Sequence, residues 1–561
     1  MKKWKVLSES VIRSQESGIK DVIKIILENR GLKIRNEIEE FLNPKLENIT
    51  VKSVGIDKKQ LQKAVQRIQT AIEEKEQIVV FGDYDVDGIC GTAILWETLN
   101  SLEAKVLPYI PHRVEEGYGL STKAIQNSVR QFGGQNIKLI ITVDNGIVAN
   151  EAVKFANKQG IDVIVTDHHV PPKKLPDAFA TVHTTKLCGA GVAWVVAQEL
   201  KVDNKDDDHL ELVALATIAD LVPLLGANRT LLKFGLEKLR QTKRAGLLEV
   251  FKEAVLEKEK IGVYEIGHII APRLNAMGRL EHAIDSLRLL CTRSTERAKM
   301  LAQTLGTTNR ERQKLTIETV EHARTRIMNY ELRIKNLLFV SDESYQQGVI
   351  GLVAGKLAEE FYKPAIVVSI GEKYSKASAR SINGFNIIEF IRSASEFLVD
   401  AGGHPMAAGF TVETSKLTLL KKKFEQKAEE LLDEEKLTRS LRIDCELDLS
   451  IINNNLYNEI QKLAPFGMGN PEPTFVSKNV VVEDKRVVGN GGKHIKFKFK
   501  VHPSDDGSKF KVDGIGFGMG ELYQNLHVGD KIDIAYTIDL NVWNGNSSLQ
   551  LKIKDMKPSS T

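Results

Sequence analysis

The sequence predicts an α/β protein with a parallel sheet in its first domain, a second α/β domain and a small antiparallel β-barrel at its C-terminal end. Short apolar runs such as "QIVVFGD" and "IKLIITVD" alternate with helical patterns of ten or more residues, which is typical of βαβ units. The runs are apolar at nearly every position, as expected of strands that are covered on both faces. From about residue 440 the apolar residues alternate with a period of two between Gly and Asn turns, which predicts the barrel.

The chain has 561 residues, which is too long for a single hydrophobic core, and its patterns divide it into successive segments. The first segment shows apolar positions at helical spacing, and we expect it to pack on the sheet that follows. A long amphipathic stretch further on predicts a helix that bridges two α/β domains. The predicted segments are the helical N-terminal segment (1–75), the first α/β domain (76–285), the long interdomain helix (286–330), the second α/β domain (331–438) and the barrel (439–561).

Composition and charge exclude several classes of protein. The formal net charge of +4 permits a polyanionic partner without requiring one. The four cysteines are scattered and form no C-x-x-C pair, which argues against a zinc site or a disulfide framework. The basic start "MKKWKVLSES" has no apolar signal-peptide core, and the longest apolar stretch (212–225) is interrupted by Asp220 and Pro223. We therefore expect a soluble, cytoplasmic protein without membrane contact.

Carboxylates and imidazoles follow the predicted strands at the points where the strands end. The carboxyl ends of parallel strands meet at one edge of a sheet, which is where ligands bind. Each aspartate by itself is explained as a cap or a turn residue. Together they favour a metal site, because clustered carboxylates repel one another unless a cation neutralises them. Oxygen ligands with an imidazole suit Mn²⁺ or Mg²⁺, and histidine favours Mn²⁺. The candidates are Asp83, Asp85 and Asp87 after the first strand, Asp144 after the second, Asp167, His168 and His169 after the third, and Asp220.

The spacing within this set suggests separate roles. Asp83 and Asp85 are two residues apart, so in an extended chain they face the same way and can hold one or two cations together. Asp87 shares that face only if the chain stays extended, and the glycine after it suggests a turn into a helix. His168 and His169 are adjacent and point in different directions, so one can bind metal while the other meets substrate. Two cations would activate a water and stabilise the leaving oxygen of a phosphodiester.

The motifs "GDYDVDG", "VDNG", "TDHH" and "IADLVPL", in this order, resemble the four motifs of the DHH phosphoesterase superfamily. The segment "AGGHPMAAGF" is similar to the glycine-rich signature of the DHHA1 domain. With "ENRGLKIRNEIEEFLNP", "APRLNAMGRL" and "LAPFGMGNPEPTF", the likeness extends over nearly the whole chain to the RecJ family of single-strand-specific exonucleases. The resemblance implies a DHH domain, a DHHA1 domain and an OB fold for the barrel.

The resemblance also implies a reaction, namely 5′→3′ hydrolysis of single-stranded DNA to mononucleotides with two divalent cations, Mn²⁺ preferred or Mg²⁺, in DNA repair and recombination. It places the metal ligands at Asp83, Asp85, Asp144, His168 and Asp220, with Asp87 as a further candidate. His169 falls beside the scissile phosphate, and Asp167 and His168 complete the catalytic motif. The implied partners are single-stranded DNA, a single-strand-binding protein and a helicase, and we expect a monomer.

Substrate contacts are implied in both α/β domains. The resemblance maps the family's 5′-end recognition to Arg113, Tyr118 and Arg279, where an arginine can fork onto a terminal phosphate and a tyrosine can stack or donate. A surface arginine without a role is the alternative. In the second domain, glycines let the backbone approach a phosphate closely. The residues implied in substrate binding are Arg113, Tyr118, Arg273, Asn275, Arg279, Ser378, Arg380, Gly402, Gly403 and His404.

Residues 494–501 of the barrel, "HIKFKFKV", sort into two faces by alternation. Ile495, Phe497, Phe499 and Val501 share one face, where a core is a better explanation than a base-stacking platform. The other face carries His494, Lys496, Lys498 and Lys500. An ordinary solvated face is one interpretation of the lysines. On an OB fold whose neighbours process DNA, we expect Lys496, Lys498 and Lys500 to form a track for phosphates.

Two other functions remain to be weighed. A DHH-family phosphodiesterase of short oligonucleotides would lack the barrel and the "APRLNAMGRL" segment, so residues 440–557 argue against it. A catalytically silent RecJ-like scaffold that binds DNA would have eroded motifs, yet all five implied metal ligands are present. The sequence therefore favours the nuclease.

Overall fold

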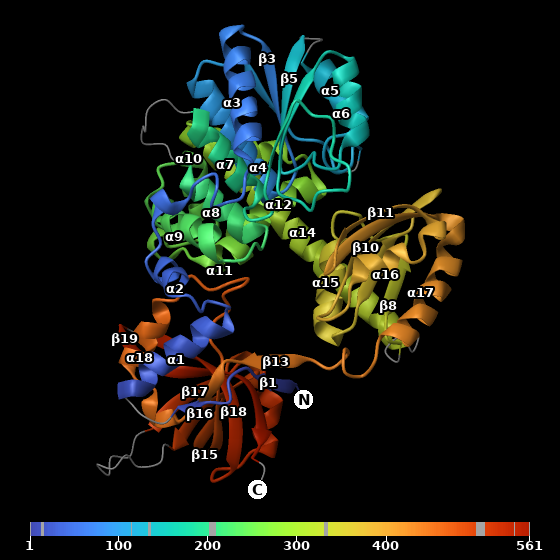
Figure 1. Ribbon diagram of the computed structural model, residues 1–561. Coiled ribbons are helices and arrows are strands. Elements are labelled where there is room, and N and C mark those ends of the chain that lie inside the picture. Colours follow the sequence, from blue (N-terminus) through green and yellow to red (C-terminus); the bar gives the residue numbers. More distant parts are fainter. Residues whose placement is uncertain are drawn as a thin grey trace. The chain divides into compact units, whose positions relative to one another are not determined.

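The computed structural model describes residues 2–12, 16–113, 115–132, 136–200, 209–329, 335–500, 511–543 and 545–559. The chain divides into two compact units, which are described separately (Figure 1). The barrel unit comprises Met1–Lys45, Pro223–Gly226 and Arg439–Thr561. The α/β unit comprises Leu46–Val222 and Ala227–Thr438. No helix of the described residues is long and apolar enough to cross a membrane.

The α/β unit begins with a parallel sheet of β3 (Gln77–Gly82), β4 (Val106–Tyr109), β5 (Ile137–Val143), β6 (Asp162–Asp167) and β7 (Ala180–His183). The strands lie in the order β4-β3-β5-β6-β7. Helices cover both faces of this sheet. They are α5 (Thr122–Gln131) and α6 (Asn150–Lys158) on one face, and α3 (Lys58–Glu73), α4 (Val86–Ser101) and α7 (Gly189–Leu200) on the other.

The apolar runs of the sequence form buried strands because both faces of the sheet are covered. Val79, Phe81 and Val163 share one core with α5 and α6, and the residues between them face the opposite helices. Gly91 lets α4 approach its neighbours, since a Cβ there would lie 2.5 Å from Val143 Cγ1 and 3.1 Å from the Cα of Ala190 on α7. The predicted parallel sheet is confirmed.

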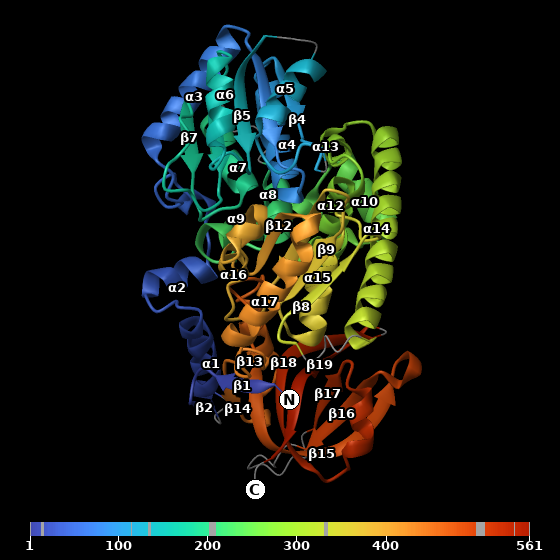
Figure 2. The same ribbon diagram turned by 90° about the vertical axis from the view of Figure 1, so that its right-hand side faces the viewer.

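A helical region follows the first sheet. Its elements are α8 (Leu210–Ala219), α9 (Gly226–Gln241), α10 (Ala245–Glu253), α11 (Val263–Glu265), a π-helical turn (Ile266–Ile270), α12 (Ala271–Leu280), α13 (Ile284–Cys291) and α14 (Thr295–Asn329). The long helix, expected from residue 286, is α14 and begins later, because α13 ends at Cys291 and the Ser294 hydroxyl accepts the N–H of Arg297. Leu301 and Leu305 are buried in the first half of α14, and Ala323 and Ile327 join the core of the next domain (Figure 2).

The second α/β domain is a mixed sheet with helices on both faces. Its elements are β8 (Leu338–Asp342), α15 (Ile350–Phe361), β9 (Ala365–Ser369), β10 (Tyr374–Arg380), α16 (Ile387–Arg392), β11 (Leu398–His404), β12 (Ala407–Glu413) and α17 (Leu417–Leu431). The strand order is β11-β12-β10-β9-β8, in which β8 and β9 are parallel and the other pairs antiparallel. Helices α14 and α15 share one core with the sheet, and α16 and α17 share the other.

The barrel is formed by β15 (Phe475–Val488), β16 (His494–Lys500), β17 (Lys511–Gly516), β18 (Lys531–Trp543) and β19 (Asn546–Pro558). It closes because β15 pairs with both β16 and β18, β19 pairs with β18 and β17, and β17 pairs with β16. These pairs are antiparallel except β17 with β19. Ile495, Phe497 and Phe499 are buried, which confirms their predicted place in the core, and Val501 lies outside the described residues.

Residues 1–45 depart from the expected N-terminal segment, because they fold with the barrel and not with the first sheet. β1 (Lys3–Val6) pairs with β13 (Ser440–Ile443), and β2 (Val11–Ile12) pairs with β14 (Cys445–Leu447). Helix α1 (Glu16–Asn29) buries Val22 and Ile26 in the core that the barrel and α18 (Asn454–Gln461) form, and α2 (Arg35–Leu42) adds Phe41. A helical pattern shows which face is buried but does not specify the partner. Of the predicted segment, α3 packs on the first sheet.

Candidate active site

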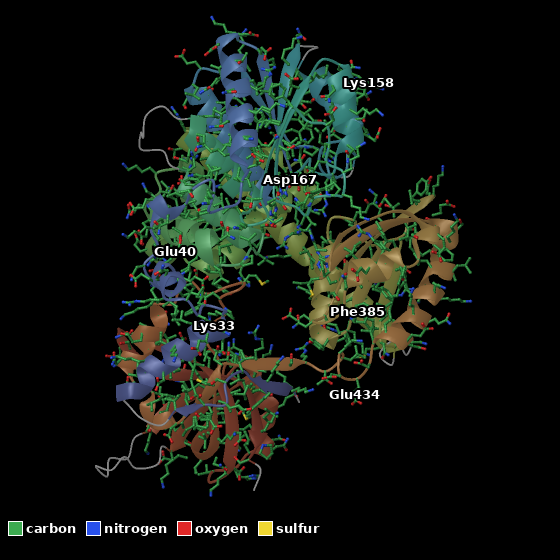
Figure 3. All side chains as sticks on the ribbon, viewed as in Figure 1. Lys33, Glu40, Lys158, Asp167, Phe385 and Glu434 are labelled. Atoms are coloured by element: carbon green, nitrogen blue, oxygen red, sulfur yellow. The ribbon has the colours of Figure 1, made fainter. Side chains whose placement is uncertain are left out.

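Carboxylates stand where the strands of the first sheet end. Asp83 follows β3, Asp144 follows β5 and Asp167 ends β6, and all of them are almost fully buried. Asp144 has a left-handed backbone (φ 62°), and its N–H donates to the carbonyl of Thr166 over 3.1 Å. Such a conformation in a non-glycine residue persists where the surroundings enforce it and is concentrated at functional sites. Figure 3 shows Asp167 inside the α/β unit, in contrast to Lys158 on its outer surface.

The start of α4 supplies two further carboxylates. Asp85 caps the helix, because its Oδ1 accepts the N–H groups of Asp87 and Gly88. Asp87 lies in the first turn and accepts the N–H groups of Gly189 and Ala190, each over 2.6 Å, from the start of α7. The chain has therefore turned into the helix at Asp87, as the following glycine suggested. Both carboxylates are held by backbone donors, which need no particular side chain.

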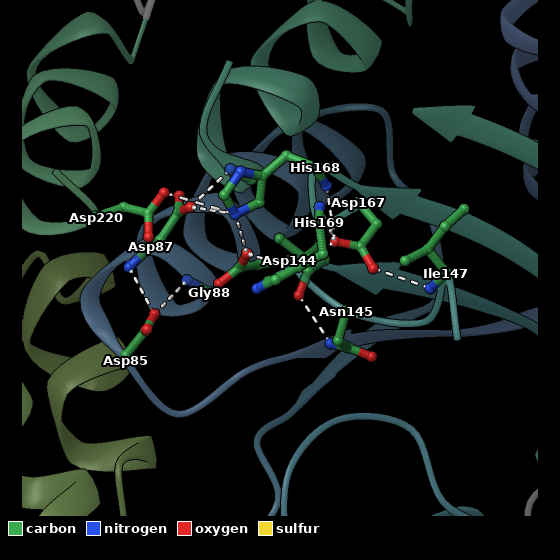
Figure 4. A network of polar contacts seen from close by, with 12 residues as sticks. Asp85, Asp87, Gly88, Asp144, Asn145, Ile147, Asp167, His168, His169 and Asp220 are labelled. Carbon is green, nitrogen blue, oxygen red and sulfur yellow. Dashed lines mark hydrogen bonds and ion pairs between the residues drawn. The ribbon is translucent and has the colours of Figure 1, made fainter. Parts of the chain in front are cut away.

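The last carboxylate comes from a different part of the α/β unit. Asp220 is the C-terminal cap of α8, and its Oδ2 lies 3.6 Å from Nε2 of His168 (Figure 4). The same imidazole nitrogen is 3.0 Å from Asp144 Oδ1 and 3.7 Å from Asp87 Oδ2. His168 thus points at the carboxylates that come from β5, α4 and α8.

The central atoms of this cluster lack the partners that buried polar atoms require. Asp83 Oδ1, Asp144 Oδ1 and His168 Nε2 are buried and form no hydrogen bond with the described residues, and the 3.0 Å contact between the last two is an ion pair only when His168 is protonated. Buried polar atoms without partners are rare and need an explanation such as an ion. Divalent cations with oxygen and imidazole ligands fit this donor set. Ligand atoms lie within 4.8 Å of one another in the groups Asp83–Asp85–Asp144, Asp87–His168–Asp220 and Asp144–His168–His169.

The protonation of the carboxylates leads to the same conclusion. Burial raises the pKa of Asp144 well above its ordinary value, and the charges of Asp87 and Asp85 raise it further. Burial and then Asp85 raise the pKa of Asp83 in the same way. The pKa of Asp220 is raised to about 9 by burial and then by Asp87 and Asp85. Bound cations would reverse these shifts, because a positive charge favours the ionised carboxylate.

The imidazole of His169 lies beside that of His168, with ring centroids 4.5 Å apart and an interplanar angle of 56°, but a separate set of hydrogen bonds holds it. Its Nδ1 lies 2.8 Å from Asp167 Oδ1, and Asp167 is itself fixed by the N–H groups of Ile147 and His169. Its Nε2 lies 3.2 Å from the hydroxyl of Tyr118, which donates to the carbonyl of Asp144. Burial alone would lower the pKa of His169, but the hydrogen bond and charge of Asp167 outweigh burial and raise it. Asp167 therefore orients the histidine and favours its protonated form.

The second α/β domain brings His404 to this histidine. The imidazoles of His404 and His169 are stacked, with ring centroids 5.9 Å apart and an interplanar angle of 20°. Gly402 has open space where a Cβ would be. Gly403 has φ +140°, and a Cβ there would lie 2.5 Å from the carbonyl oxygen of Ala407. The end of β11 thus places a histidine and bare backbone beside His169.

A group of arginines lies between the two α/β domains. Burial lowers the pKa of Arg279, and the positive charges of Arg113, Arg312 and Arg380 lower it further. Arg380 donates to the Ser378 hydroxyl over 3.2 Å. These four arginines are half-buried, and clustered guanidinium groups in such a position favour an anion such as a phosphate. Arg312 was missed from the sequence, because a charged position on a long helix carries no signal until the packing of α14 is known.

Other predicted substrate residues are engaged elsewhere. Arg273 donates from Nε to Glu253 over 2.7 Å, and Glu253 also pairs with Arg310. Asn275 accepts the N–H of Val86 with its Oδ1 over 3.0 Å, so it supports the start of α4 that carries Asp85. The predicted lysine track, Lys496, Lys498 and Lys500, lies on β16 of the barrel unit.

Comparisons with known proteins agree with this arrangement. Family models match the chain as the DHH family N-terminal domain at residues 77–217, the DHHA1 domain at 334–430 and the RecJ OB domain at 443–555. The chain is 36% identical over 553 residues to the single-stranded-DNA-specific exonuclease RecJ of Bacillus subtilis, a match that spans 97% of this chain and 68% of that protein. The chain belongs to the RecJ family. The RecJ of Haemophilus influenzae is 31% identical over 530 residues, or 89% of this chain and 90% of that one.

Solved RecJ structures share the fold and contain metal. The crystal structure of Thermus thermophilus RecJ in complex with Mn²⁺ matches with a TM-score of 0.82 and 28% identity, over 100% of this chain and 80% of that chain. The Mg²⁺ complex of the same protein matches with a TM-score of 0.76, over 100% of this chain and 79% of that chain. The predicted fold class and the expected divalent cations, Mn²⁺ or Mg²⁺, are therefore confirmed for the family to which this chain belongs.

Proposed function

We propose that this RecJ-family protein is a metal-dependent exonuclease that hydrolyses single-stranded DNA in the 5′→3′ direction to 5′-mononucleotides. The observation that carries the proposal is the convergence of carboxylates on His168, with buried atoms that have no protein partner among the described residues. The substrate class comes from relatives, which are named single-stranded-DNA-specific exonucleases. Metal dependence is supported by the Mn²⁺ and Mg²⁺ complexes of the Thermus protein.

The residues that would hold the cations divide into two groups that meet at Asp144. Asp83 and Asp85 would contribute with it to one ion, and His168 and Asp220, together with the further candidate Asp87, to the other. When bound, such cations lower the pKa of water and neutralise charge that develops on a phosphodiester during displacement. Asp87 has a structural role in addition, because it joins α4 to α7 through the amides that it accepts.

His169 supplies positive charge and a proton on its Nε2 atom. The hydroxyl hydrogen of Tyr118 goes to the carbonyl of Asp144, so its oxygen accepts from Nε2 of His169. Asp167 accepts from Nδ1, so both ring nitrogens carry hydrogen. The imidazolium attracts the scissile phosphate and can release the Nε2 proton to a leaving oxygen. Burial and the neighbouring histidines lower the pKa of His404, which leaves it a neutral hydrogen-bond donor beside His169.

The arginine group would select the end of the strand. Arg113, Arg279 and Arg380, with Ser378, offer charge-assisted donors for a terminal phosphate, which carries more negative charge than an internal one. Arg312 adds to the positive potential from α14. A 5′-terminal phosphate held in this group would determine which phosphodiester reaches the carboxylates.

We also propose the setting in which the enzyme works. The activity would serve DNA repair and recombination in the cytoplasm, where a helicase and a single-strand-binding protein provide the strand. The protein would act as a monomer. The proposed domain boundaries remain 76–285 for the DHH domain, 331–438 for the DHHA1 domain and 439–561 for the OB fold, and residues 1–45 are added to the OB unit.

A nuclease assay with strands labelled at either end tests the proposed function. The wild-type protein should release labelled mononucleotides from the 5′ end of a single strand with Mn²⁺ or Mg²⁺, and none from duplex DNA or in a chelator. Initial release from the 3′ end would contradict the direction. Preference for dinucleotides over long strands would indicate a phosphodiesterase of short oligonucleotides. Tight binding without hydrolysis in any metal would indicate a silent scaffold.

A further inference from the structure

An exposed aromatic ring stands at one end of the barrel, beside basic side chains. Phe517 directly follows β17 and is 54% exposed. Its ring meets the imidazole of His494 edge to face, with centroids 5.3 Å apart and an interplanar angle of 74°. The N–H of Gly518 donates to Nδ1 of His494 over 3.0 Å. The imidazole is therefore fixed in place and supports the edge of the ring, while much of the ring remains open to solvent.

The backbone around this ring leaves room for a planar ligand. The loop between β15 and β16 is glycine-rich, and it is tied to the segment after β17 by a hydrogen bond from the N–H of Gly520 to the carbonyl of Lys493 (3.0 Å). Gly491 and Gly518 both have φ +69°, and a Cβ at either position would meet nothing within 4 Å. At Gly491 and Gly518, the backbone beside Phe517 therefore carries no side chain that would cover the ring.

Two basic side chains without a counter-charge lie on the same face of the barrel, two residues along the strands from His494. Arg486 of β15 and Lys496 of β16 are directly opposite in the ladder, where like charges repel. No carboxylate of the described residues forms an ion pair with either of them, as the ion pairs of this unit involve other residues. This pair is two residues along the strands from His494 and Phe517, which corresponds to about 7 Å. An anion between Arg486 and Lys496 would remove the repulsion.

The rest of the predicted lysine track is different. Lys498 lies opposite Asp484 on one side and Asp513 on the other, so its charge is balanced. Lys500 lies opposite Lys511, which pairs with Glu483 over 2.8 Å. Uncompensated charge therefore lies at Arg486 and Lys496 and, among the described residues, at Lys500, and the first two are the ones that stand beside the exposed ring of Phe517.

We propose that Arg486, His494, Lys496 and Phe517, the Phe517 patch, bind one nucleotide of a single strand. The base stacks on Phe517, and its phosphate lies between Arg486 and Lys496. The assignment rests on the proposed function, which supplies the single strand as ligand. Every base has a π face, so an aromatic ring next to cations suits a strand of any sequence. The face of strands two and three and the loop between strands one and two are where OB folds bind oligonucleotides, and the patch lies there.

Binding of a labelled single strand to the full-length protein in a chelator tests the stacking half of the proposal, because no hydrolysis occurs. Phe517→Ala should weaken binding by about five- to a hundred-fold, and Phe517→Trp should retain affinity. A strand with abasic sites should bind the wild type as weakly as it binds Phe517→Ala. Val528→Ala, which removes another exposed apolar side chain of the same unit, serves as the control. Equal affinity of wild type and Phe517→Ala for the normal strand would overturn the proposal.

The phosphate half has its own measurement. The double variant Arg486→Ala, Lys496→Ala should reduce the slope of log affinity against log salt by about 0.7 for each phosphate that the protein no longer neutralises. Lys478→Ala, which removes an exposed lysine that pairs with Glu446, should leave that slope unchanged. An unchanged slope in the double variant would overturn this half. Failure of the proposed function would appear separately, as a wild type that binds the strand but never cleaves it with metal.

Discussion

The strand ends of the first sheet and the Phe517 patch of the barrel carry charge of opposite sign in opposite surroundings. Asp83 and Asp144 are buried, repel their neighbours and have oxygens without protein partners among the described residues. Arg486 and Lys496 repel each other as well, but they lie on an outer face of the barrel, where water weakens the repulsion. The first arrangement is strongly unfavourable without a cation, whereas the second is only weakly unfavourable without an anion.

This difference explains how each region is built. Hydrogen-bond donors offset the cost of removing a carboxylate from water, and Asp85, Asp87 and Asp167 are held by backbone N–H groups from several segments. The exposed patch needs only a strand register that leaves two basic side chains, Arg486 and Lys496, opposite each other. We therefore expect substitutions at the strand ends to have large effects on catalysis, and substitutions in the patch to have graded effects on binding.

The largest expected effect is at Asp144. Asp144→Asn should reduce metal-dependent hydrolysis by about a thousand-fold or more, because the residue belongs to two of the three groups of possible cation ligands and an amide carries no negative charge. The metal-free variant should also unfold at a higher temperature, since a buried repelling carboxylate has been removed. Single-turnover rates with Mn²⁺ and thermal melting in a chelator measure the two effects. Asp177→Asn, at an exposed position, is the matched control, and wild-type rates in Asp144→Asn would contradict the site.

The arginine group lies between the two extremes, because its side chains are half-buried and positively charged. Arg380→Met should lower kcat/KM by about 10- to 100-fold on a strand with a 5′-phosphate, since the variant cannot donate a charge-assisted hydrogen bond. The same substitution should lower kcat/KM far less on a strand with a 5′-hydroxyl. The ratio of kcat/KM on the two strands is the measurement.

The chain offers a control for this experiment. Arg273→Met removes a partly buried arginine that pairs with Glu253, so it should lower the melting temperature without changing the ratio. If Arg380→Met lowered kcat/KM equally on both strands, end selection by this group would be refuted.

The sheet and its charged edge could be predicted from the sequence because they follow from local patterns. A parallel sheet places all strand ends at one edge, so the order of apolar runs was enough to bring Asp83, Asp144 and Asp167 together. The expectation that His168 and His169 point apart holds only for their partners, Asp144 and Asp167, because the two rings lie side by side with centroids 4.5 Å apart. Their exact partners, such as the Tyr118 hydroxyl on His169, required the structure.

What could not be predicted depends on packing between distant segments. Residues 1–45 have a helical pattern that does not reveal their partner, and β13 and β14 provide the edges that β1 and β2 complete. Arg312 comes near Arg279 only because of where α14 packs. The balanced charge of Lys498 depends on strand register with Asp484 and Asp513, which lie well apart in the sequence. Alternation showed which face the lysines share but not what lies opposite them.

Smaller effects on stability should follow the protonation of the metal-free site. The pKa of Asp220 is raised to about 9 in the folded protein, against about 4 for an unfolded aspartate. The folded state therefore binds the proton more tightly, and metal-free stability should fall as pH rises from about 4 to 9, by at most about 1.4 kcal/mol per pH unit for each such carboxyl. Melting curves between pH 6 and 9 in a chelator measure the slope.

Saturating Mn²⁺ should remove this slope or reverse it, because cations compete with protons for the same oxygens. Asp220→Asn should flatten the metal-free slope, and Asp177→Asn should not. A metal-free melting temperature that does not vary over this range would show that the carboxylates are already ionised and balanced by other groups.

The smallest expected effects distinguish the lysines of β16 from one another. Lys496→Ala should weaken binding of a single strand several-fold and lower the salt slope by about 0.7, because its charge has no counter-charge among the described residues. Lys498→Ala should change neither, since Asp484 and Asp513 already balance it. Affinity and salt dependence, measured in a chelator for both variants, decide between a continuous track and a local patch. Equal losses at Lys496 and Lys498 would favour the continuous track and would place the strand along the whole of β16.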